Sequence, residues 1–245
     1  MFGWIGRCLA TRPMDEPRGY AICTVPRTGS SLLCQWLANT GMLGRPWEYF
    51  HTHGARRLIH PNYPDDPQAQ LDWILTKGST SNGIYGVKVF AHQHEAVAQV
   101  FDWTEALPRL HYVSLERRDR LGQAISWLRA AQSSQFQSWD APRGEISYDA
   151  ATIRNYLEEV DRQYAFWAEF FRRRRIRPVR LFYEDALDDP QQAINHIART
   201  FGLVGLVRAS QVGVTLAIQR DATTEEWRTR YLAEMGKPAR SAQAG

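Results

Sequence analysis

Cysteine and long apolar segments are both scarce in this sequence of 245 residues. The three cysteines, Cys8, Cys23 and Cys34, are odd in number and lack the paired spacing of a zinc site. They therefore suggest no disulfide framework and indicate reduced thiols, as in the cytoplasm. The mildly apolar segment at residues 1–10 is interrupted by Arg7 and is too short for a signal core or a membrane span. We expect a cytoplasmic protein with no membrane span and no bound metal.

An excess of charge of one sign is also missing. The net charge of +4 and the isoelectric point near 9.1 are basic, but acidic and basic residues are interspersed. This pattern argues against a broad nucleic-acid-binding surface and suits a small, highly charged anion. The one concentrated basic run, Arg172 to Arg175, follows a segment rich in aromatics. We interpret it as the solvated end of an amphipathic helix.

The ordinary nucleoside-triphosphate loop, Gly-x-x-x-x-Gly-Lys-Ser/Thr, is absent, which argues against an ATPase or a kinase. A different basic loop follows the first apolar segment. Tyr20 to Val25 predicts a buried strand, Pro26 ends it, and apolar residues recur at helical spacing from residue 32. Free N–H groups at the start of such a helix attract an anion, and Ser30 is expected to cap it. The segment predicts an anion-binding loop made of Arg27, Thr28, Gly29, Ser30 and Ser31.

A second basic segment follows another apolar run. Leu110 to Leu115 predicts a buried strand, and the four residues after it lead into an amphipathic helix. In this segment Arg118 precedes Ser126 by eight residues. An arginine fork and a serine hydroxyl are suited to phosphate oxygens. For either residue alone, an exposed arginine or a half-buried serine on a helix is the better interpretation.

The remaining apolar segments alternate between the strand and the helix pattern. Strands are predicted at Ile84–Phe90 and Val179–Tyr183, and helices at Glu95–Phe101, Ala150–Phe171 and Pro190–Phe201. The polar stretches His51–Asn82 and Gln132–Asp149 are predicted to be loops that build a ligand pocket. The alternation favours an α/β fold with a mainly parallel sheet and helices on both faces. Ligands of such sheets bind outside the carboxyl ends of the strands, where both basic segments lie.

The first basic segment resembles the 5′-phosphosulfate-binding loop of sulfotransferases that use 3′-phosphoadenosine-5′-phosphosulfate (PAPS). Its form, Pro-Arg-Thr-Gly-Ser-Ser-Leu-Leu, is similar to that of the bacterial trehalose 2-sulfotransferase-like family. Gly86–Lys88, Tyr183–Asp185 and residues 219–231 are similar to further blocks of that family. The resemblance spans about residues 19–231. It implies one sulfotransferase domain over residues 1–245, with a P-loop-like α/β fold and short terminal extensions.

The resemblance also implies where the donor binds. In the family the loop holds the 5′-phosphosulfate, and an Arg and a Ser eight residues apart hold the 3′-phosphate. The implied donor-binding residues are Arg27, Thr28, Gly29, Ser30, Ser31, Arg118, Ser126 and Arg220. Lys88 is expected to add positive charge near the sulfuryl group. No metal is needed, because arginine, serine and backbone donors surround the leaving bisphosphate.

The acceptor side is implied by residues 44–50, Gly-Arg-Pro-Trp-Glu-Tyr-Phe, which resemble an element that follows the family's first helix. Its glutamate takes the proton of the sugar hydroxyl, and this role falls on Glu48. The flanking Trp47, Tyr49 and Phe50 are expected to bind the acceptor and to desolvate the carboxylate in part, which makes it a stronger base once the acceptor displaces water. From the residues alone, a surface glutamate beside core aromatics is an equal alternative.

Two histidines are rivals for the same role. His92 and His94 follow Lys88 by four and six residues, and hormone-type sulfotransferases carry their base shortly after such a lysine. We rank them behind Glu48, as acceptor ligands or as loop histidines with no chemical role.

The sequence thus indicates sulfuryl transfer from PAPS to a hydroxyl of a carbohydrate or glycolipid, with a trehalose-like sugar favoured. Arg27, Lys88 and Glu48 are the expected catalytic residues, and a homodimer is compatible with the resemblance. The alternatives are a P-loop-type small-molecule kinase, a sulfotransferase acting on a non-sugar metabolite, and a non-catalytic protein that binds the bisphosphate.

Overall fold

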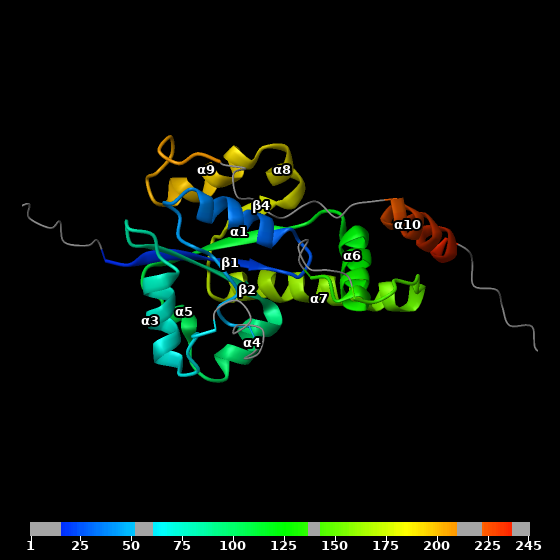
Figure 1. Ribbon diagram of the computed structural model, residues 1–245, viewed down its shortest axis with the longest axis horizontal. Coiled ribbons are helices and arrows are strands. Elements are labelled where there is room, and N and C mark those ends of the chain that lie inside the picture. Colours follow the sequence, from blue (N-terminus) through cyan, green and yellow to red (C-terminus); the bar gives the residue numbers. More distant parts are fainter. Residues whose placement is uncertain (1–15, 52–60, 137–142, 210–221, 237–245) are drawn as a thin grey trace, which may run out of the picture.

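A parallel four-stranded sheet with the strand order β2-β1-β3-β4 forms the centre of the molecule. The computed structural model describes residues 16–51, 61–136, 143–209 and 222–236 (Figure 1). The strands are β1 (Arg18–Thr24), β2 (Ile84–Phe90), β3 (Leu110–Glu116) and β4 (Val179–Phe182). The predicted α/β fold with a parallel sheet is therefore confirmed.

The central strands are nearly continuous apolar runs because helices cover both faces of the sheet. In β1, Tyr20 and Ile22 face one core, whereas Ala21 and Cys23 face the other. Register pairs Thr24 with Phe90, so β1 and β2 end side by side. The segments that follow these two strands are thereby brought to the same edge of the sheet.

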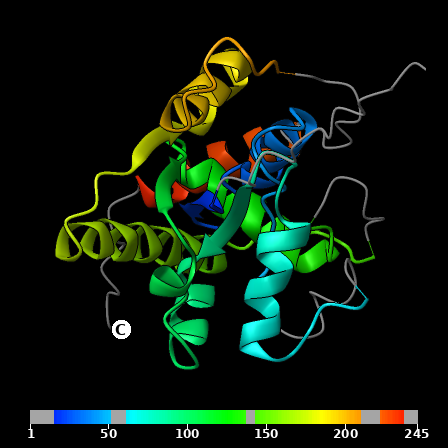
Figure 2. The same ribbon diagram turned by 90° about the vertical axis from the view of Figure 1, so that its left-hand side faces the viewer.

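The helices are α1 (Ser30–Asn39), α3 (Pro67–Lys77), α4 (Ala91–Ala98), α5 (Trp103–Ala106), α6 (Arg120–Ser133), α7 (Ala150–Arg173), α8 (Tyr183–Asp188), α9 (Pro190–Thr200) and α10 (Ala222–Met235). Helices α1 and α9 cover one face, and α3, α4 and α7 cover the other (Figures 1 and 2). A smaller apolar cluster joins α6, α7 and α10 beyond the carboxyl ends of the strands. Except for the helix after β2, the predicted strands and helices are confirmed to within a few residues.

The helix after β2 lies earlier in the chain than predicted. It spans Ala91–Ala98 rather than Glu95–Phe101. It begins directly where the strand ends, and the side chain of Gln93 accepts a hydrogen bond from the backbone N–H of Phe90. The apolar Val100, which extended the predicted helix, is 67% exposed and contributes nothing to its buried face.

Part of the predicted loop from His51 to Asn82 is helical, because α3 lies within it. The Asp66 side chain caps this helix by accepting from the N–H of Ala69 at 2.8 Å. Its buried face carries only Leu71, Ile74 and the polar Gln70, which is too little apolar periodicity to stand out in the sequence. The stretch from Gln132 to Asp149 has no helix or strand at residues 134–136 and 143–149, as predicted.

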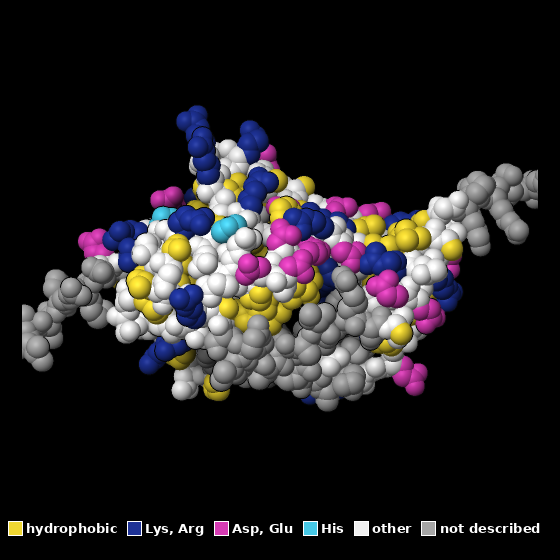
Figure 3. Space-filling view, turned by 90° about the horizontal axis from the view of Figure 1, so that it is seen from above, with side chains coloured by type: hydrophobic (Ala, Val, Ile, Leu, Met, Phe, Trp, Pro, Cys, Tyr) yellow, Lys and Arg dark blue, Asp and Glu magenta, His cyan; other side chains and the backbone are white. Residues whose placement is uncertain are grey.

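The arginine run ends helix α7, as expected. Arg172 and Arg173 are more than 70% exposed and pair with Glu169 one turn earlier. Arg174 instead binds Asp102 at the start of α5 at 3.0 Å. Figure 3 shows basic and acidic side chains interspersed over the described part of the face that carries α8 and α9. None of the helices in the described ranges is long and apolar enough to cross a bilayer.

Truncation of Ile194 tests the packing of α9 on the sheet. Its side chain is fully buried, so Ile194→Ala should lower the free energy of unfolding by about 2–5 kcal/mol in chemical denaturation. Leu206, which is 65% exposed, provides the control, and Leu206→Ala should stay within about 0.5 kcal/mol of the wild type. Equal losses in the two variants would contradict this packing.

Candidate active site

The loop between β1 and α1 presents a helix N-terminus at the carboxyl edge of the sheet. Gly29, rather than the predicted Ser30, is the N-cap, and its carbonyl accepts the first two helical N–H bonds, from Leu32 and Leu33. Ser30 is instead the first helical residue. The N–H groups of Ser30 and Ser31 precede those bonds, so the helix itself supplies them with no acceptor.

Two features explain why residue 29 is a glycine. Gly29 has φ of 85°, in the left-handed region that residues with a Cβ rarely adopt. A Cβ on Gly29 would also lie 2.3 Å from the ring of Tyr183, the first residue of α8. A larger residue at this position would therefore be strained and would have to displace the Tyr183 ring.

The side chain of Thr28 anchors the rest of the loop to the end of β1. Thr28 is fully buried, and its hydroxyl contacts the hydroxyl of Thr24 at 2.9 Å and donates to the carbonyl of Val25. This anchor leaves Arg27 at φ of 64°, an unfavourable conformation for a residue other than glycine.

Side chains of the second basic segment hold the loop carbonyls. Gln123 Nε2 donates to the carbonyl of Pro26 at 2.7 Å, and Arg117 Nη1 donates to the carbonyl of Arg27 at 3.2 Å. Neither Gln123 nor Arg117 is among the residues expected from the sequence. Each lies near an expected residue in the sequence but belongs to no recognisable motif. Its contact with the loop is therefore visible only in the folded structure.

Arg27 also makes a side-chain contact with the second segment. Its Nε donates to Ser126 Oγ at 3.1 Å, and its Nη1 donates to the carbonyl of Phe136 at 2.5 Å. Burial, followed by the charge of Arg117, lowers the pKa of Arg27 to about 10, so the guanidinium stays charged at neutral pH. The structure thus brings together residues that the sequence assigned to separate phosphate sites.

Arg118 lies at the exposed mouth of this region. Its guanidinium binds both carboxylate oxygens of Asp185, at 2.5 and 2.7 Å, and stacks 4.1 Å from the centroid of Phe182. The hydrogen bonds from Arg118 hold the pKa of Asp185 below its usual value. The fork of Arg118 is therefore already used for a bidentate anion contact.

A buried lysine links the loop to the predicted acceptor element. Lys88 on β2 is fully buried, and its Nζ lies 2.7 Å from Glu48 Oε1 and donates to Ser31 Oγ at 3.0 Å. The pairing is fixed by the backbone, because the Lys88 N–H donates to the carbonyl of Trp47 at 2.8 Å. Glu48 and the start of α1 therefore share one cation.

The second oxygen of Glu48 has other partners. Gln93 Nε2 donates to Glu48 Oε2 at 2.9 Å, and His51 Nε2 lies 3.7 Å from the same oxygen. Burial alone raises the pKa of Glu48, but Lys88, His51 and Gln93 together lower it below its usual value. The carboxylate faces Lys88, and here its partners outweigh the effect of burial on its pKa. That Glu48 becomes a stronger base once an acceptor displaces water stays a prediction.

The three aromatic residues expected to bind the acceptor differ in burial and in their neighbours. Tyr49 and Phe50 are 3% and 5% exposed and belong to the hydrophobic core, where the Tyr49 hydroxyl donates to the carbonyl of Arg45 at 2.8 Å. Trp47 is half-buried, and the Nζ of Lys88 lies 5.5 Å from its ring centroid. Of the three, only Trp47 presents its ring beside the cation that holds Glu48.

The two rival histidines flank Gln93 and take separate positions. His92 is exposed, and its ring stacks on Phe90 at 5.7 Å. His94 Nδ1 accepts a hydrogen bond from Trp103 Nε1 at 3.1 Å and packs among the aromatic rings of α7. Burial, with the charge of Arg174, lowers the pKa of His94. Arg220, the remaining expected residue, lies outside the described residues.

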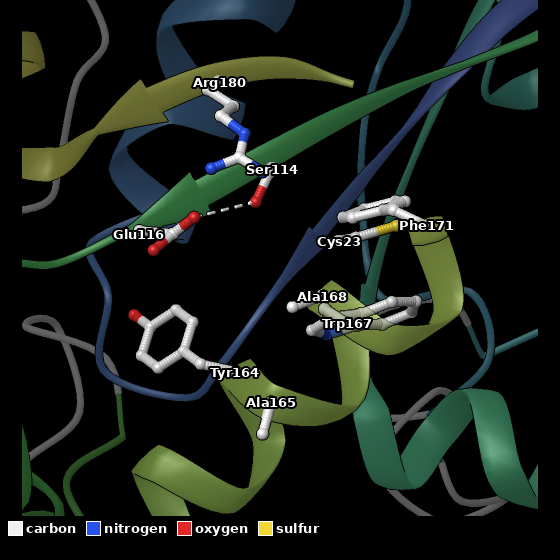
Figure 4. A pocket seen from close by; sticks show the side chains of 9 residues that line it. All are labelled: Cys23, Ser114, Glu116, Tyr164, Ala165, Trp167, Ala168, Phe171 and Arg180. Carbon is white, nitrogen blue, oxygen red and sulfur yellow. Dashed lines mark hydrogen bonds between the residues drawn. The ribbon is translucent and has the colours of Figure 1, made fainter. Parts of the chain in front are cut away.

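A cavity of about 290 Å³ lies between β3, β4 and α7 (Figure 4). Its lining residues are Cys23, Ser114, Glu116, Tyr164, Ala165, Trp167, Ala168, Phe171 and Arg180. None of the expected site residues lines it. The Tyr164 hydroxyl accepts from the Arg117 N–H at 3.0 Å and donates to Gln123 Oε1 at 3.1 Å. The cavity wall thus supports the side chains that hold the loop.

Comparison with known proteins identifies the family. Residues 19–234 match the family described as Stf0 sulphotransferase. The chain belongs to this family. It is therefore an enzyme of the sulfotransferase class, and the ranges described here contain no group of three or more His, Cys, Asp or Glu side chains arranged to hold a metal ion.

Individual relatives of this Stf0 sulphotransferase are distant. The trehalose 2-sulfotransferases of Mycolicibacterium smegmatis and Mycobacterium tuberculosis are each 24% identical, and each alignment covers 89% of this chain and 95% of the relative. Among solved structures, retinol dehydratase in complex with retinol and PAP is 13% identical, with a TM-score of 0.35. That match covers 91% of this chain and 83% of the other.

Removal of Lys88 tests the buried ion pair in this sulfotransferase. Lys88→Met leaves the Glu48 carboxylate buried without its cation, so the free energy of unfolding near pH 7 should fall by about 3–5 kcal/mol. Lys77→Met on the exposed surface of α3 is the control and should change it by less than about 0.5 kcal/mol.

The pH dependence of the free energy of unfolding tests whether the loss in Lys88→Met comes from the ion pair with Glu48. In the wild type the folded-state pKa of Glu48 is lowered, so its contribution to stability is present above the unfolded value of about 4.3. That contribution is lost as the pH falls through the folded pKa. The deficit of Lys88→Met should therefore shrink on acidification, and a deficit that grows instead would contradict the pairing.

Proposed function

We propose that this Stf0 sulphotransferase transfers a sulfuryl group from PAPS to a hydroxyl of a carbohydrate or glycolipid acceptor, with a trehalose-like sugar favoured. The observation that carries the proposal is the double contact of Lys88, at 2.7 Å from Glu48 and 3.0 Å from Ser31. It joins a candidate base to an anion-binding helix N-terminus across one cation. The similarity to two trehalose 2-sulfotransferases supports a sugar acceptor.

The side chains present fit a donor with two anionic ends. The N–H groups of Ser30 and Ser31, with Lys88 beside them, suit the 5′-phosphosulfate, and Gly29 allows close approach of the backbone. At the other end, the Asp185 carboxylate occupies the Arg118 fork as two phosphate oxygens would. PAPS would supply the activated sulfuryl group and its bisphosphate leaving group.

Arg27 would lie between the two anionic ends of the donor. Its guanidinium reaches Ser126, the hydroxyl expected at the 3′-phosphate, while its backbone belongs to the loop. A charged, buried guanidinium there is placed to stabilise negative charge on the leaving group without reorganisation. Thr28, whose hydroxyl is used inside the loop, contributes by holding its shape.

Glu48 accepts the proton of the acceptor hydroxyl in this scheme. Its lowered pKa keeps it ionised at neutral pH, which is the state a base requires. When the donor binds, its sulfuryl oxygens and Glu48 would compete for the single Nζ of Lys88. The interaction between Lys88 and Glu48 would then weaken. The pKa of Glu48 then rises toward that of a buried carboxyl without a cation, and its basicity increases once the donor is present.

The location that fits this chemistry is the bacterial cytoplasm, in keeping with the cysteine usage. Cys23 and Cys34 are buried free thiols. A P-loop-type kinase has no support from the site, since no lysine follows Gly29 as in the nucleoside-triphosphate loop.

Affinity for the product, adenosine 3′,5′-bisphosphate, tests the phosphate fork. Arg118→Ala should weaken its binding by about ten-fold or more in calorimetric titration, because a charge-assisted contact is lost. Asp185→Asn is the matched variant that frees the fork, and it should bind as tightly as the wild type or more tightly. Wild-type protein should also prefer the bisphosphate to AMP. Equal affinity for the two nucleotides would rule out this 3′-phosphate site.

Turnover of Glu48→Gln tests the base. The substitution keeps the shape but removes the proton acceptor, so kcat with PAPS and trehalose, or the acceptor found by screening, should fall by roughly 10²- to 10⁴-fold. Affinity for the bisphosphate should barely change. His92→Ala and His94→Ala should each be milder. If Glu48→Gln keeps most of the activity while a histidine variant loses it, the base is a histidine.

A further inference from the structure

Gln93 is turned inward between two histidines that the sequence favours over it. It is 3% exposed, whereas His92 is exposed and His94 points into the aromatic cluster beside α7. Successive helical residues are about 100° apart, so the position at which a helix starts decides which side chain faces the site. Because α4 begins at Ala91, the residue that faces Glu48 is Gln93.

The orientation of the Gln93 carboxamide is fixed by two bonds of opposite sense. Its Oε1 accepts from the N–H of Phe90 at 3.1 Å, and its Nε2 donates to Glu48 Oε2 at 2.9 Å. A flipped amide would set its NH₂ group against the Phe90 N–H and its oxygen against the carboxylate. Both bonds would be lost, so Gln93 presents a donor to Glu48 at every pH.

The two oxygens of Glu48 consequently have separate tasks. Oε1 contacts Lys88, which also reaches the loop at Ser31. Oε2 accepts a hydrogen bond from Gln93 and lies 3.7 Å from His51 Nε2, and the other bond of Gln93 is to the N–H of Phe90 on β2. A shift of Lys88 toward an anion at the loop would therefore release Oε1 and leave the hold on Oε2 in place.

We propose that Gln93 is the positioning residue for Glu48, holding Oε2 so that Oε1 faces the loop as the proton acceptor. This inference rests on the proposed role of Glu48 as the base. Gln93 itself touches neither substrate nor the reacting atoms. A neutral amide suits this task, because it neither titrates nor offers a second positive charge that would compete with Lys88 for the sulfuryl oxygens.

Direct titration of Glu48 in the ligand-free protein tests the proposal without any assay of activity. Proteins labelled with ¹³C at glutamate carboxyls are titrated by NMR, and the Glu48 signal is assigned by its absence in Glu48→Gln. Gln93→Leu removes a hydrogen bond that favours the charged form, so the midpoint of Glu48 should rise by about one pH unit. An unchanged midpoint overturns the proposal.

Gln163 provides a matched control. It is 1% exposed, and its Nε2 donates to Glu159 Oε1 at 2.6 Å, on α7 rather than beside Lys88. Gln163→Leu removes an equivalent buried amide, so a loss of stability is expected. The midpoint of Glu48 should stay at the wild-type value. A shift as large as that in Gln93→Leu would mean that general loosening, and not the contact, moves the midpoint.

Gln93→Glu separates the donor from the helix-capping role, and it decides the question if Gln93→Leu does not fold. The introduced carboxyl can still accept from the Phe90 N–H but brings a like charge to Glu48. Two carboxyls in contact share a proton, so one midpoint should rise well above the ordinary glutamate range. Two ordinary midpoints would show that residue 93 does not hold Glu48.

Kinetics then distinguish a failure of this inference from a failure of the proposed function. With PAPS and trehalose, the acid limb of the kcat/KM profile for PAPS, which reports groups of the free enzyme, should move to higher pH in Gln93→Leu by the same amount as the midpoint. The KM for PAPS should not change, and kcat at the optimum should fall by about ten-fold. A midpoint that moves while the acid limb stays overturns Glu48 as the base. A midpoint that stays overturns only the role of Gln93.

Discussion

The buried ammonium group of Lys88 is the constraint on which the site depends. A fully buried cation is costly unless anions and hydroxyls surround it, and Glu48 and Ser31 are the groups that do so. Three parts of the chain must therefore meet: strand β2, the segment at residues 44–50 and the start of α1. The backbone bond from the Lys88 N–H to the Trp47 carbonyl fixes that meeting. The proposed base and the proposed anion-binding helix end are thus placed together by one ion pair.

The second dependence is between the two basic segments. The loop after β1 contains a non-glycine residue, Arg27, in the left-handed conformation, and such backbone persists only when its surroundings hold it. Gln123 and Arg117 supply that hold through the carbonyls of Pro26 and Arg27. The segment expected to bind one phosphate therefore shapes the loop expected to bind the other. Changes at either segment should affect the whole of the proposed donor site.

Much of this fold can be predicted from local sequence patterns. The strands β1, β2 and β3 are apolar runs bounded by clear breaks, and the residue types from Arg27 to Ser31 indicate an anion-binding loop. What the sequence misses depends on contacts between distant segments. The lowered pKa of Glu48 arises from Lys88, forty residues away along the chain, and no local pattern shows it.

The position of Gln93 shows how a small local error spreads to the site. A start of the helix four residues too late, at residue 95 instead of 91, leaves residues 92 to 94 in a loop, where a histidine is the natural candidate. The correct start places Gln93 inside and both histidines elsewhere. Its capping bond to Phe90 is the one signal that marks the start, and it belongs to a residue pair without a strong sequence preference.

Product analysis by mass spectrometry tests the central claim most directly. The protein is incubated with PAPS in a metabolite extract containing trehalose, with a chelator present, and with ATP and Mg²⁺ in a parallel reaction. The account predicts that a hydroxylated acceptor gains one sulfuryl group from PAPS despite the chelator, and that ATP gives no phosphorylated product. Phosphoryl transfer from ATP, or a bound donor that is never consumed, would contradict it.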